Sequence, residues 1–313
     1  ERFNMKYLIT GAAGFIGSNI VEELVGRGEE VVALDNLSTG HMRNVEPFLE
    51  DIEFIEGDIR DVETCHGACA GVDYVIHQAA LGSVPRSIED PIATHENNAT
   101  GTLNMLVAAR DAEAKSFVFA ASSSVYGDTD VLPKVETMPL RPMSPYATSK
   151  ATCERYLKNF SDIYGLNTVG VRYFNIFGPR QDPNGPYAAV IPKFMQLLVD
   201  GETPVIHWDG EQTRDFTYID NAVQANLKAA EHAERAAGEI VNIGFGEQTS
   251  INQLYRIIAE QLGVDTEPEY APKRAGDVRD SLADIRKAKE LIGYEPEVDI
   301  EEGLRRTVAW FRE

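Results

Sequence analysis

Short apolar runs alternate with amphipathic stretches over the first 175 residues, and this rhythm constrains the fold more than any other feature. Nearly continuous apolar runs between helices are typical of buried parallel strands. The expected strands span residues 6–10, 30–34, 52–56, 74–78, 116–121 and 168–173. The sequence therefore predicts an α/β fold with a Rossmann-type, doubly wound parallel sheet.

The rhythm changes after Tyr173, which predicts a second, smaller lobe. A turn-rich loop with three prolines covers residues 178–186, and a helix is expected over 190–200. The apolar run 239–243 is typical of one more buried strand of the first sheet. We expect one domain from residues 1–175, with about 213–243 returning to it. Residues 176–212 and 244–313 would then form a mixed α/β lobe that binds the substrate.

Composition limits the possible partners of the chain. No apolar run approaches the ~18 residues of a membrane span, and a net charge of −21 argues against nucleic acid. Three cysteines suit a reducing cytoplasm rather than a disulfide scaffold, and no signal peptide is evident at the N-terminus. Cys65, His66 and Cys69 fall on an expected helix without a second ligand pair, so we expect no metal.

A glycine-rich turn follows the first expected strand and leads into a helix. Gly11, Gly14 and Gly17 permit a tight turn, a close approach to a pyrophosphate and close helix packing, and the helix N-terminus favours phosphate. Asp35 ends the second strand, where its carboxylate can accept hydrogen bonds from ribose hydroxyls and would repel a 2′-phosphate. Asp58 follows the third strand, in a place suited to adenine. The pattern predicts NAD binding rather than NADP binding.

Ser122 is followed 24 residues later by Tyr146-x-x-x-Lys150. A phenol titrates near pH 10, so tyrosine is a poor base at neutrality. A lysine one helical turn away can place its ammonium beside the phenol and favour the phenolate. Together with a dinucleotide site, this spacing predicts redox chemistry on an alcohol or ketone.

These motifs together resemble the extended short-chain dehydrogenase/reductase family, over essentially the whole chain. The segments that carry the resemblance are 10–17, 35–36, 58–61, 77–80, 146–150 and 172–175. Within the family the chain is similar to nucleotide-sugar 4-epimerases, which are isomerases. Residues 82–87 and 180–185 resemble the subgroup that acts on UDP-N-acetylglucosamine.

The resemblance implies that Tyr146 takes the proton of the sugar 4-hydroxyl while hydride passes between C4 and a tightly bound, recycled NAD. Lys150 would lower the tyrosine pKa and Ser122 would hydrogen-bond the reacting oxygen. The 4-keto sugar would then turn over and take hydride back on its other face. The implied cofactor-binding residues are Gly11, Gly14, Phe15, Ile16, Gly17, Asp35, Asn36, Ser38, Gly40, Asp58, Ile59, Gln78, Ala79, Ala80, Asn97, Tyr146, Lys150 and Tyr173.

A UDP-sugar is the substrate that the resemblance implies. The matching positions are Ser83, Arg86, Ser122, Ser123, Ser124, Tyr146, Asn175, Ala189, Val190, Arg214, Arg274, Asp277 and Ser281. Arg214 and Arg274 would clamp the diphosphate. Ser281 aligns with a gate at which a small residue leaves room for an acetamido group. Because the chain is acidic, we also expect arginines to gather at the anionic site, from among Arg86, Arg172, Arg180, Arg214, Arg274 and Arg279.

Sister activities can be separated at Ser123 and Ser124. The related 4,6-dehydratases place an Asp-Glu pair there, and UDP-glucuronate decarboxylases place a Glu at the second position. Hydroxyls cannot replace a carboxylate base at neutral pH, so both activities are excluded. UDP-glucose 4-epimerase, UDP-glucuronate 4-epimerase and a non-catalytic, NAD-binding redox sensor stay open. The resemblance also implies a homodimer formed through helices at 97–111 and 145–164.

Overall fold

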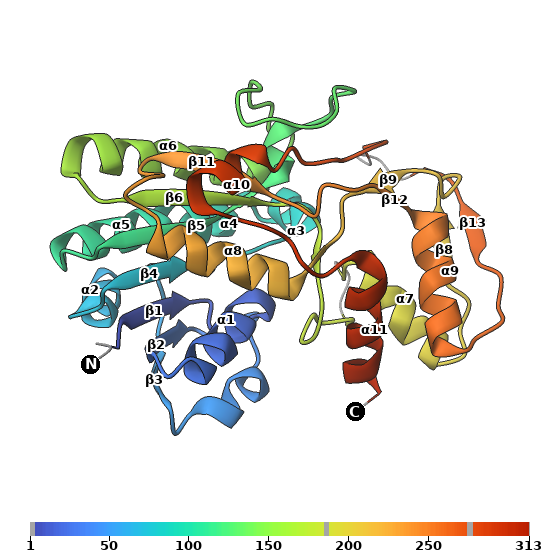
Figure 1. Cartoon of the computed structure of the whole chain (residues 1–313), viewed down its shortest axis with the longest axis horizontal. Helices are drawn as coiled ribbons and strands as arrows, with labels where there is room; N and C mark the ends of the chain where they lie inside the picture. The colour runs from blue at the N-terminus through green and yellow to red at the C-terminus, as the bar shows by residue number, and fades with distance from the viewer. Residues whose placement is uncertain (1–3, 185–187, 274–277, 313) are drawn as a thin grey trace.

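The computed structural model describes residues 4–184, 188–273 and 278–312 (Figure 1). A seven-stranded sheet in the order β11-β6-β5-β4-β1-β2-β3 lies at its centre. The strands, all parallel, are β1 (Lys6–Thr10), β2 (Glu30–Asp35), β3 (Ile52–Glu56), β4 (Tyr74–His77), β5 (Ser116–Ser122), β6 (Thr168–Tyr173) and β11 (Glu239–Ile243). The expected Rossmann-type sheet is confirmed, and no expected strand boundary is wrong by more than one residue.

Helices cover both faces of this sheet, because its apolar residues point to both sides. One core cluster combines residues of α1 (Phe15–Gly26) and α8 (Ile219–Glu231) with the sheet. The other combines α2 (Val62–Cys69), α5 (Gly101–Asp111) and α6 (Pro145–Tyr164) with the opposite face. Short 3-10 turns occur at Met42–Asn44, Glu46–Phe48 and Ser123–Tyr126.

The helix expected at 97–111 begins earlier and is not a regular α-helix. After α3 (Val84–Glu89), α4 (Pro91–His95) runs directly into a π-helical turn at Glu96–Thr100, which α5 continues. The Asn98 side chain in this turn accepts from the Leu81 N–H at 2.8 Å. Such π-turns are rare and frequently occur at functional sites, and a hydrophobic period cannot reveal them.

Most of the remaining elements lie beside the sheet, to the right in Figure 1, among them α7 (Val190–Val199), α9 (Ile251–Leu262) and α11 (Ile300–Phe311). By contrast, α10 (Arg286–Ile292) lies over the sheet next to β11. The chain also forms three two-stranded pairs. The pairs are β7 (Ile176–Phe177) with β10 (Thr217–Tyr218), β8 (Val205–His207) with β13 (Glu269–Ala271), and β9 (Thr213–Arg214) with β12 (Thr249–Ser250). We propose that the two lobes divide as the sequence predicts. None of the described helices has both the length and the apolar character to cross a bilayer.

Two glycines allow α1 to approach the end of β1. Gly11 has a φ of +67°, and a Cβ there would lie 2.8 Å from the Ala79 backbone nitrogen. A Cβ on Gly17, in the first turn of α1, would lie only 2.1 Å from the Gly11 carbonyl oxygen. Both contacts are with backbone atoms, which cannot rotate away. The glycines therefore set how closely helix and strand pack.

We expect Gly17→Ala to lower the free energy of unfolding by about 3 kcal/mol, because one methyl group must displace backbone. Gly26→Ala is the matched control, since Gly26 ends the same helix and a Cβ there meets nothing within 4 Å. That control should leave stability unchanged or raise it by about 0.5 kcal/mol. Urea unfolding of both variants measures the difference, and equal stabilities would contradict the packing argument.

Candidate functional site

A cavity of about 380 Å³ opens at the carboxyl ends of the parallel strands, where open α/β sheets bind their ligands. It brings together every residue expected to bind the cofactor except Asp58. Sequence reasoning missed seven further lining residues: Leu34, Thr39, Gly57, Leu81, Gly82, Ala120 and Ala121. Leu34, Ala120 and Ala121 lie within the last three residues of their strands, and Gly57 directly follows one. Strand ends were therefore the signal that could have found them.

The N-terminus of α1 borders this cavity beside the glycine turn. Its N-cap is Gly14, which offers no side chain to the first backbone N–H groups of the helix. The first turn contains no acidic residue. Free N–H groups and the positive end of a helix dipole favour an anion. This end of the cavity suits a pyrophosphate.

Asp35 is held rigidly at the end of β2. Its carboxylate accepts from the backbone N–H groups of Ala13 at 2.9 Å and Leu37 at 2.8 Å. Burial raises its pKa, and the two hydrogen bonds oppose that rise. An ionised carboxylate has about four acceptor sites, so two stay open to ribose hydroxyls.

Asp58 lies outside the cavity lining but supports it. It accepts from Asn36 Nδ2 at 2.9 Å and from the Arg60 guanidinium, whose hydrogen bonds hold the Asp58 pKa well below its usual range. Asn36 lines the cavity. Asp58 therefore orients a lining residue instead of facing the cavity itself.

Tyr146 and Lys150 of the Ser-Tyr-Lys constellation line this cavity, and Ser122 is hydrogen-bonded to Tyr146. Ser122 ends β5, and Tyr146 and Lys150 lie in the first turns of α6, which Ser144 caps by accepting from the Ala147 N–H at 3.1 Å. Lys150 is nearly fully buried and donates from Nζ to the Ala120 carbonyl oxygen at 2.7 Å. Its Nζ lies 5.9 Å from the centre of the Tyr146 ring. The ammonium thus lies near the phenol while bonded to the strand.

Burial acts in opposite directions on the pKa values of these two groups. It raises the pKa of Tyr146, which a hydrogen bond with Ser122 lowers in part. It lowers the pKa of Lys150 to about 8. Since each shift disfavours the charged form, the phenolate needs positive charge nearby. Lys150, still mostly charged at neutral pH, supplies part of it.

Hydroxyls surround the reacting end of the site. Ser122 Oγ and Ser124 Oγ lie 2.9 Å apart, and the Ser124 N–H donates to Ser122 Oγ at 3.2 Å. Ser123 begins the same 3-10 turn. This turn therefore carries three hydroxyls and no carboxylate.

Among the described residues expected to bind substrate, only Tyr146 lines the large cavity. Ser83 caps α3 by accepting from the Arg86 N–H at 3.2 Å. Ala189 is the N-cap of α7, and Val190 begins that helix. The structure thus places Ser83 at the start of α3 and the other two at the start of α7. Arg274 and Asp277 lie outside the described residues.

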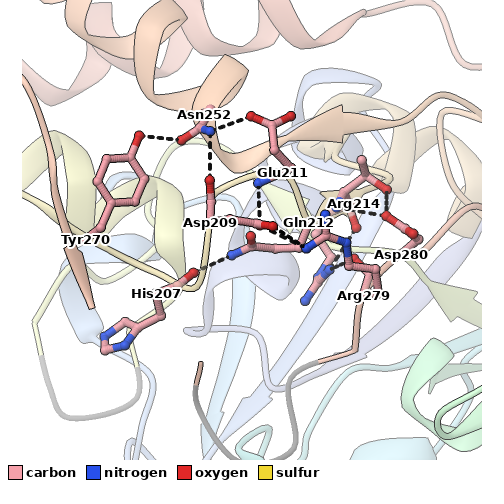
Figure 2. Close-up of polar contacts among 10 residues, drawn as sticks. His207, Asp209, Glu211, Gln212, Arg214, Asn252, Tyr270, Arg279 and Asp280 are labelled. Carbon is pink, nitrogen blue, oxygen red and sulfur yellow. Dashed lines mark hydrogen bonds and ion pairs between the residues drawn. The ribbon is translucent and has the colours of Figure 1, made fainter. Parts of the chain in front are cut away.

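Segment 279–281 is fastened to β9 by a polar network (Figure 2). Arg214 Nη1 donates to the carbonyl oxygens of Thr213 at 2.8 Å and Arg279 at 3.2 Å, and the Ser281 N–H donates to the Thr213 carbonyl at 3.2 Å. The Arg279 guanidinium binds Asp209 at 2.9 Å. Ser281 is only 5% exposed and lies apart from the cavity lining.

Arg172 does not take part in an anionic site, so that expectation is wrong. Its Nε and Nη2 each donate to the Glu154 carboxylate at 2.7 Å, and its Nη1 donates to the Tyr126 hydroxyl at 2.8 Å. The whole group is buried. Arg180 is paired too, with Glu22 at 2.7 Å. Position in sequence could not reveal these internal partners.

Asn175 is held in a left-handed conformation with a φ of +40°, just after β6. Its Nδ2 donates to the Asp215 carbonyl oxygen at 3.1 Å. Residues 175 and 215 lie in the two segments that lead from the sheet to the other lobe. Asn175 therefore links these two segments beside the site.

The described residues hold no group of three or more His, Cys, Asp or Glu side chains with metal-binding geometry. Cys65 and Cys69 lie buried on one face of α2, and burial raises the pKa of each thiol to about 12. Thiols with such pKa values stay protonated and behave as small apolar residues.

A dinucleotide cavity next to a Ser-Tyr-Lys constellation defines a nicotinamide-dependent enzyme. The model of the NAD dependent epimerase/dehydratase family matches residues 7–244. The chain belongs to this family, as the expected resemblance to extended short-chain dehydrogenases/reductases implied. It is an isomerase with NAD as its cofactor, and both expectations are confirmed.

Relatives resemble the chain over its full length. A putative UDP-glucose 4-epimerase of Methanocaldococcus jannaschii is 41% identical over 97% of this chain and 98% of its own. A solved UDP-N-acetylglucosamine 4-epimerase from Methanobrevibacter ruminantium M1, in complex with UDP-N-acetylmuramic acid, is 42% identical with a TM-score of 0.94, covering 99% and 98% of the chains. The UDP-glucose 4-epimerase of Thermus thermophilus, solved with NAD, is 38% identical with a TM-score of 0.88, covering 98% and 99%.

The residues present fit NAD. The close approach at Gly11 and Gly17 leaves no room for a Cβ, the uncapped α1 N-terminus suits the pyrophosphate, and Asp35 retains acceptor sites. Gln78, Lys150 and Tyr173 line the same cavity as Tyr146. The glycine turn and Asp35 would therefore hold NAD, which would supply the hydride acceptor beside Tyr146.

Proposed function

We propose that this protein interconverts UDP-N-acetylglucosamine and UDP-N-acetylgalactosamine by inverting C4. One observation carries the proposal: Tyr146 and Lys150 line a dinucleotide cavity with Ser122 hydrogen-bonded to Tyr146, while Ser123 and Ser124 offer no further acid or base. Inversion through a ketone needs a single proton acceptor that later returns its proton. Elimination and decarboxylation need additional carboxylates.

Each residue of the constellation has a distinct task in this reaction. When bound, NAD supplies the hydride acceptor and donor. Tyr146 takes the proton of the 4-hydroxyl and later gives it back, and Ser122 orients the same oxygen by a hydrogen bond. Lys150, anchored on the Ala120 carbonyl, contributes the positive charge that favours the phenolate. The reaction has no net oxidation, so the cofactor recycles within the protein.

The second lobe supports a UDP-sugar. Arg214 lies half-buried in β9 and is fastened by two backbone carbonyls, so its guanidinium is restricted. A restricted guanidinium suits bidentate contacts with phosphate. In our proposal Arg214 clamps the diphosphate together with Arg274, and Asn175 and Asp277 contact the diphosphate and the uridine ribose.

The N-acetyl preference rests on Ser281. A serine at this position leaves room that a larger side chain would fill, and the solved relative from M. ruminantium is a UDP-N-acetylglucosamine 4-epimerase. A roomy pocket also admits UDP-glucose, since contacts that a smaller sugar lacks cost only about 1–3 kcal/mol. UDP-glucose 4-epimerase is therefore the second candidate, and the M. jannaschii relative favours it.

Turnover of two sugars in parallel tests the proposal. Purified protein without added NAD is given UDP-N-acetylglucosamine or UDP-glucose, and the products are separated by chromatography. We expect faster formation of UDP-N-acetylgalactosamine, because cofactor is retained and the pocket accepts the acetamido group. Turnover of UDP-glucose alone would reject the Ser281 argument and leave the epimerase intact. No turnover of either sugar, even with NAD added, would favour UDP-glucuronate or a non-catalytic redox sensor.

We expect Tyr146→Phe to abolish turnover, with a loss of at least about 10³-fold, because Tyr146 is the phenol that is hydrogen-bonded to Ser122. Bound NAD, measured after acid release, should stay at the wild-type level, since the glycine turn and Asp35 are untouched. Tyr156→Phe, on the same helix, is the matched control and should keep full activity. A Tyr146→Phe protein with wild-type rate would contradict the base assignment.

We also propose that two copies pair through the apolar face of α3, α4 and α6. Ile88 and Ile92 are 65% and 70% exposed on α3 and α4, and Ile163 near the end of α6 is 68% exposed. Since α3 and α4 both pack against α6, the three isoleucines belong to one layer of helices. Six residues of α5 are buried, and in our proposal its other side chains join this face, as expected of the helix at 97–111.

Sedimentation should therefore give twice the mass of one chain. Ile88→Glu with Ile92→Glu should shift the protein to monomers, because buried carboxylates would lose hydration. Val131→Glu is the control, as Val131 is equally exposed but lies in a loop away from these helices. A wild-type monomer, or an unchanged dimer in the double variant, would reject this interface.

A further inference from the structure

A buried ion pair lies directly behind the catalytic lysine. Glu154 follows Lys150 by one turn of α6, and Arg172 precedes Tyr173 in β6. Their side chains are 3% and 4% exposed, and two parallel hydrogen bonds of 2.7 Å join them. Burying two charges removes their hydration, which costs free energy. Their attraction offsets this cost only when the geometry is as favourable as these two parallel hydrogen bonds. An apolar pair would often be as stable, so stability does not explain why this pair is here.

The pair continues as a chain of hydrogen bonds towards the substrate lobe. Arg172 Nη1 donates to the Tyr126 hydroxyl at 2.8 Å, and that hydroxyl donates to Asn242 Oδ1 at 2.6 Å. Asn242 Nδ2 then donates to the carbonyl oxygens of Lys134 at 2.9 Å and Asp284 at 3.2 Å. Tyr126 and Asn242 are fully buried.

The chain ends beside Ser281. The Lys134 N–H donates to the Leu282 carbonyl oxygen at 2.8 Å, and the Asp284 N–H donates to the Lys134 carbonyl at 3.0 Å. Hydrogen bonds with Asn242 and Lys134 thereby hold residues 282–284, and the Thr213 carbonyl oxygen accepts from the Ser281 N–H. One polar path thus joins the helix of Tyr146 and Lys150 to the segment that carries the proposed gate.

Glu154 is the anion closest in sequence to Lys150. The titratable groups that face Lys150 are Tyr146, Cys153 and Glu154 on its own helix and His77 on β4. His77 is fully buried and neutral, since burial lowers its pKa. Glu154 and Cys153 raise the pKa of Lys150 against the larger effect of burial. Glu154 carries its charge in the pair with Arg172, so it is the charge that helps to keep Lys150 protonated.

We propose that Glu154 and Arg172 are positioning residues, whose ion pair keeps the Lys150 ammonium charged and aligns α6, through Tyr126 and Asn242, with the substrate segment 281–284. The paired, directional hydrogen bonds fix the position of α6 along β6. Apolar packing alone is not directional and would let the helix shift along the strand. This inference rests on the proposed epimerisation for its role in catalysis. The electrostatic part holds for the protein without substrate and can be measured there.

Glu154→Gln tests the electrostatic part, because it removes the charge and retains the shape. Lysines are labelled with ¹³C at Cε, and the Lys150 signal, assigned with Lys150→Met, is titrated by NMR. We expect its midpoint to fall by roughly one pH unit, and the alkaline limb of kcat to fall by the same amount. Glu211→Gln, an exposed carboxylate, is the control and should leave both unchanged. An unmoved Lys150 midpoint would overturn the proposal.

If the Glu154→Gln variant does not fold because Arg172 has lost its partner, a second variant is used. It combines Glu154→Gln with Arg172→Met and so replaces the ion pair by two neutral side chains. Because this double variant removes one negative and one positive charge, a smaller fall of the Lys150 midpoint is expected, and no fall at all again overturns the proposal. If the wild-type protein titrates as described but epimerises neither sugar, the proposed function fails while the positioning of Lys150 stands.

Tyr126→Phe tests the alignment part, since it cuts the path beyond Arg172 and leaves the ion pair intact. We expect KM for the UDP-sugar to rise about fivefold, as for one lost hydrogen bond, with kcat and the Lys150 midpoint unchanged. A merely structural hydroxyl would lower stability without this split. An unchanged KM, or a loss of kcat alone, would contradict the path to segment 281–284.

Discussion

The parallel direction of all seven strands is the constraint on which the rest of the structure depends. It places every strand end at one edge, so that Gly11, Asp35, Gln78, Ser122 and Tyr173 meet there despite their distance in sequence. Parallel strands require long crossovers, which here become the helices that cover both faces. The cavity is therefore a direct consequence of topology, and the helices that enclose the core also supply its catalytic groups.

Close backbone contacts and buried charges determine the detailed geometry and the protonation of the site that the strand order creates. The approach of α1 to β1 at Gly17 directs free N–H groups at the cavity. Buried ionisable groups then take their properties from neighbours: burial lowers the pKa of Lys150 to about 8 and raises that of Asp215 to about 6, although three backbone N–H groups bind the latter. Asp215 joins the segments after β11 and before α10, so a buried carboxylate also organises the border of the lobes.

Local sequence patterns predicted most of the first lobe. Strands 6–10, 52–56, 168–173 and 239–243 agree with the structure, because buried parallel strands leave a plain apolar signature. The cofactor cavity was likewise predictable, since its residues cluster at strand ends. The π-turn before α5, the buried partner of Arg172 and the place of Ser281 apart from the cavity were not. Each depends on contacts between segments far apart in the chain.

The sequence by itself determined the elements, the glycine turn and the Tyr146–Lys150 spacing, because each is encoded within about ten residues. Only the tertiary structure decided which partners each charged side chain has. Arg172 and Arg214 look alike in sequence. Arg172 pairs with the buried Glu154 carboxylate, whereas Arg214 lies half-buried at β9 and donates to a backbone carbonyl oxygen. Pairing is a property of neighbours in space. Whether a charged side chain serves a ligand or the core is thus settled only when distant segments pack together.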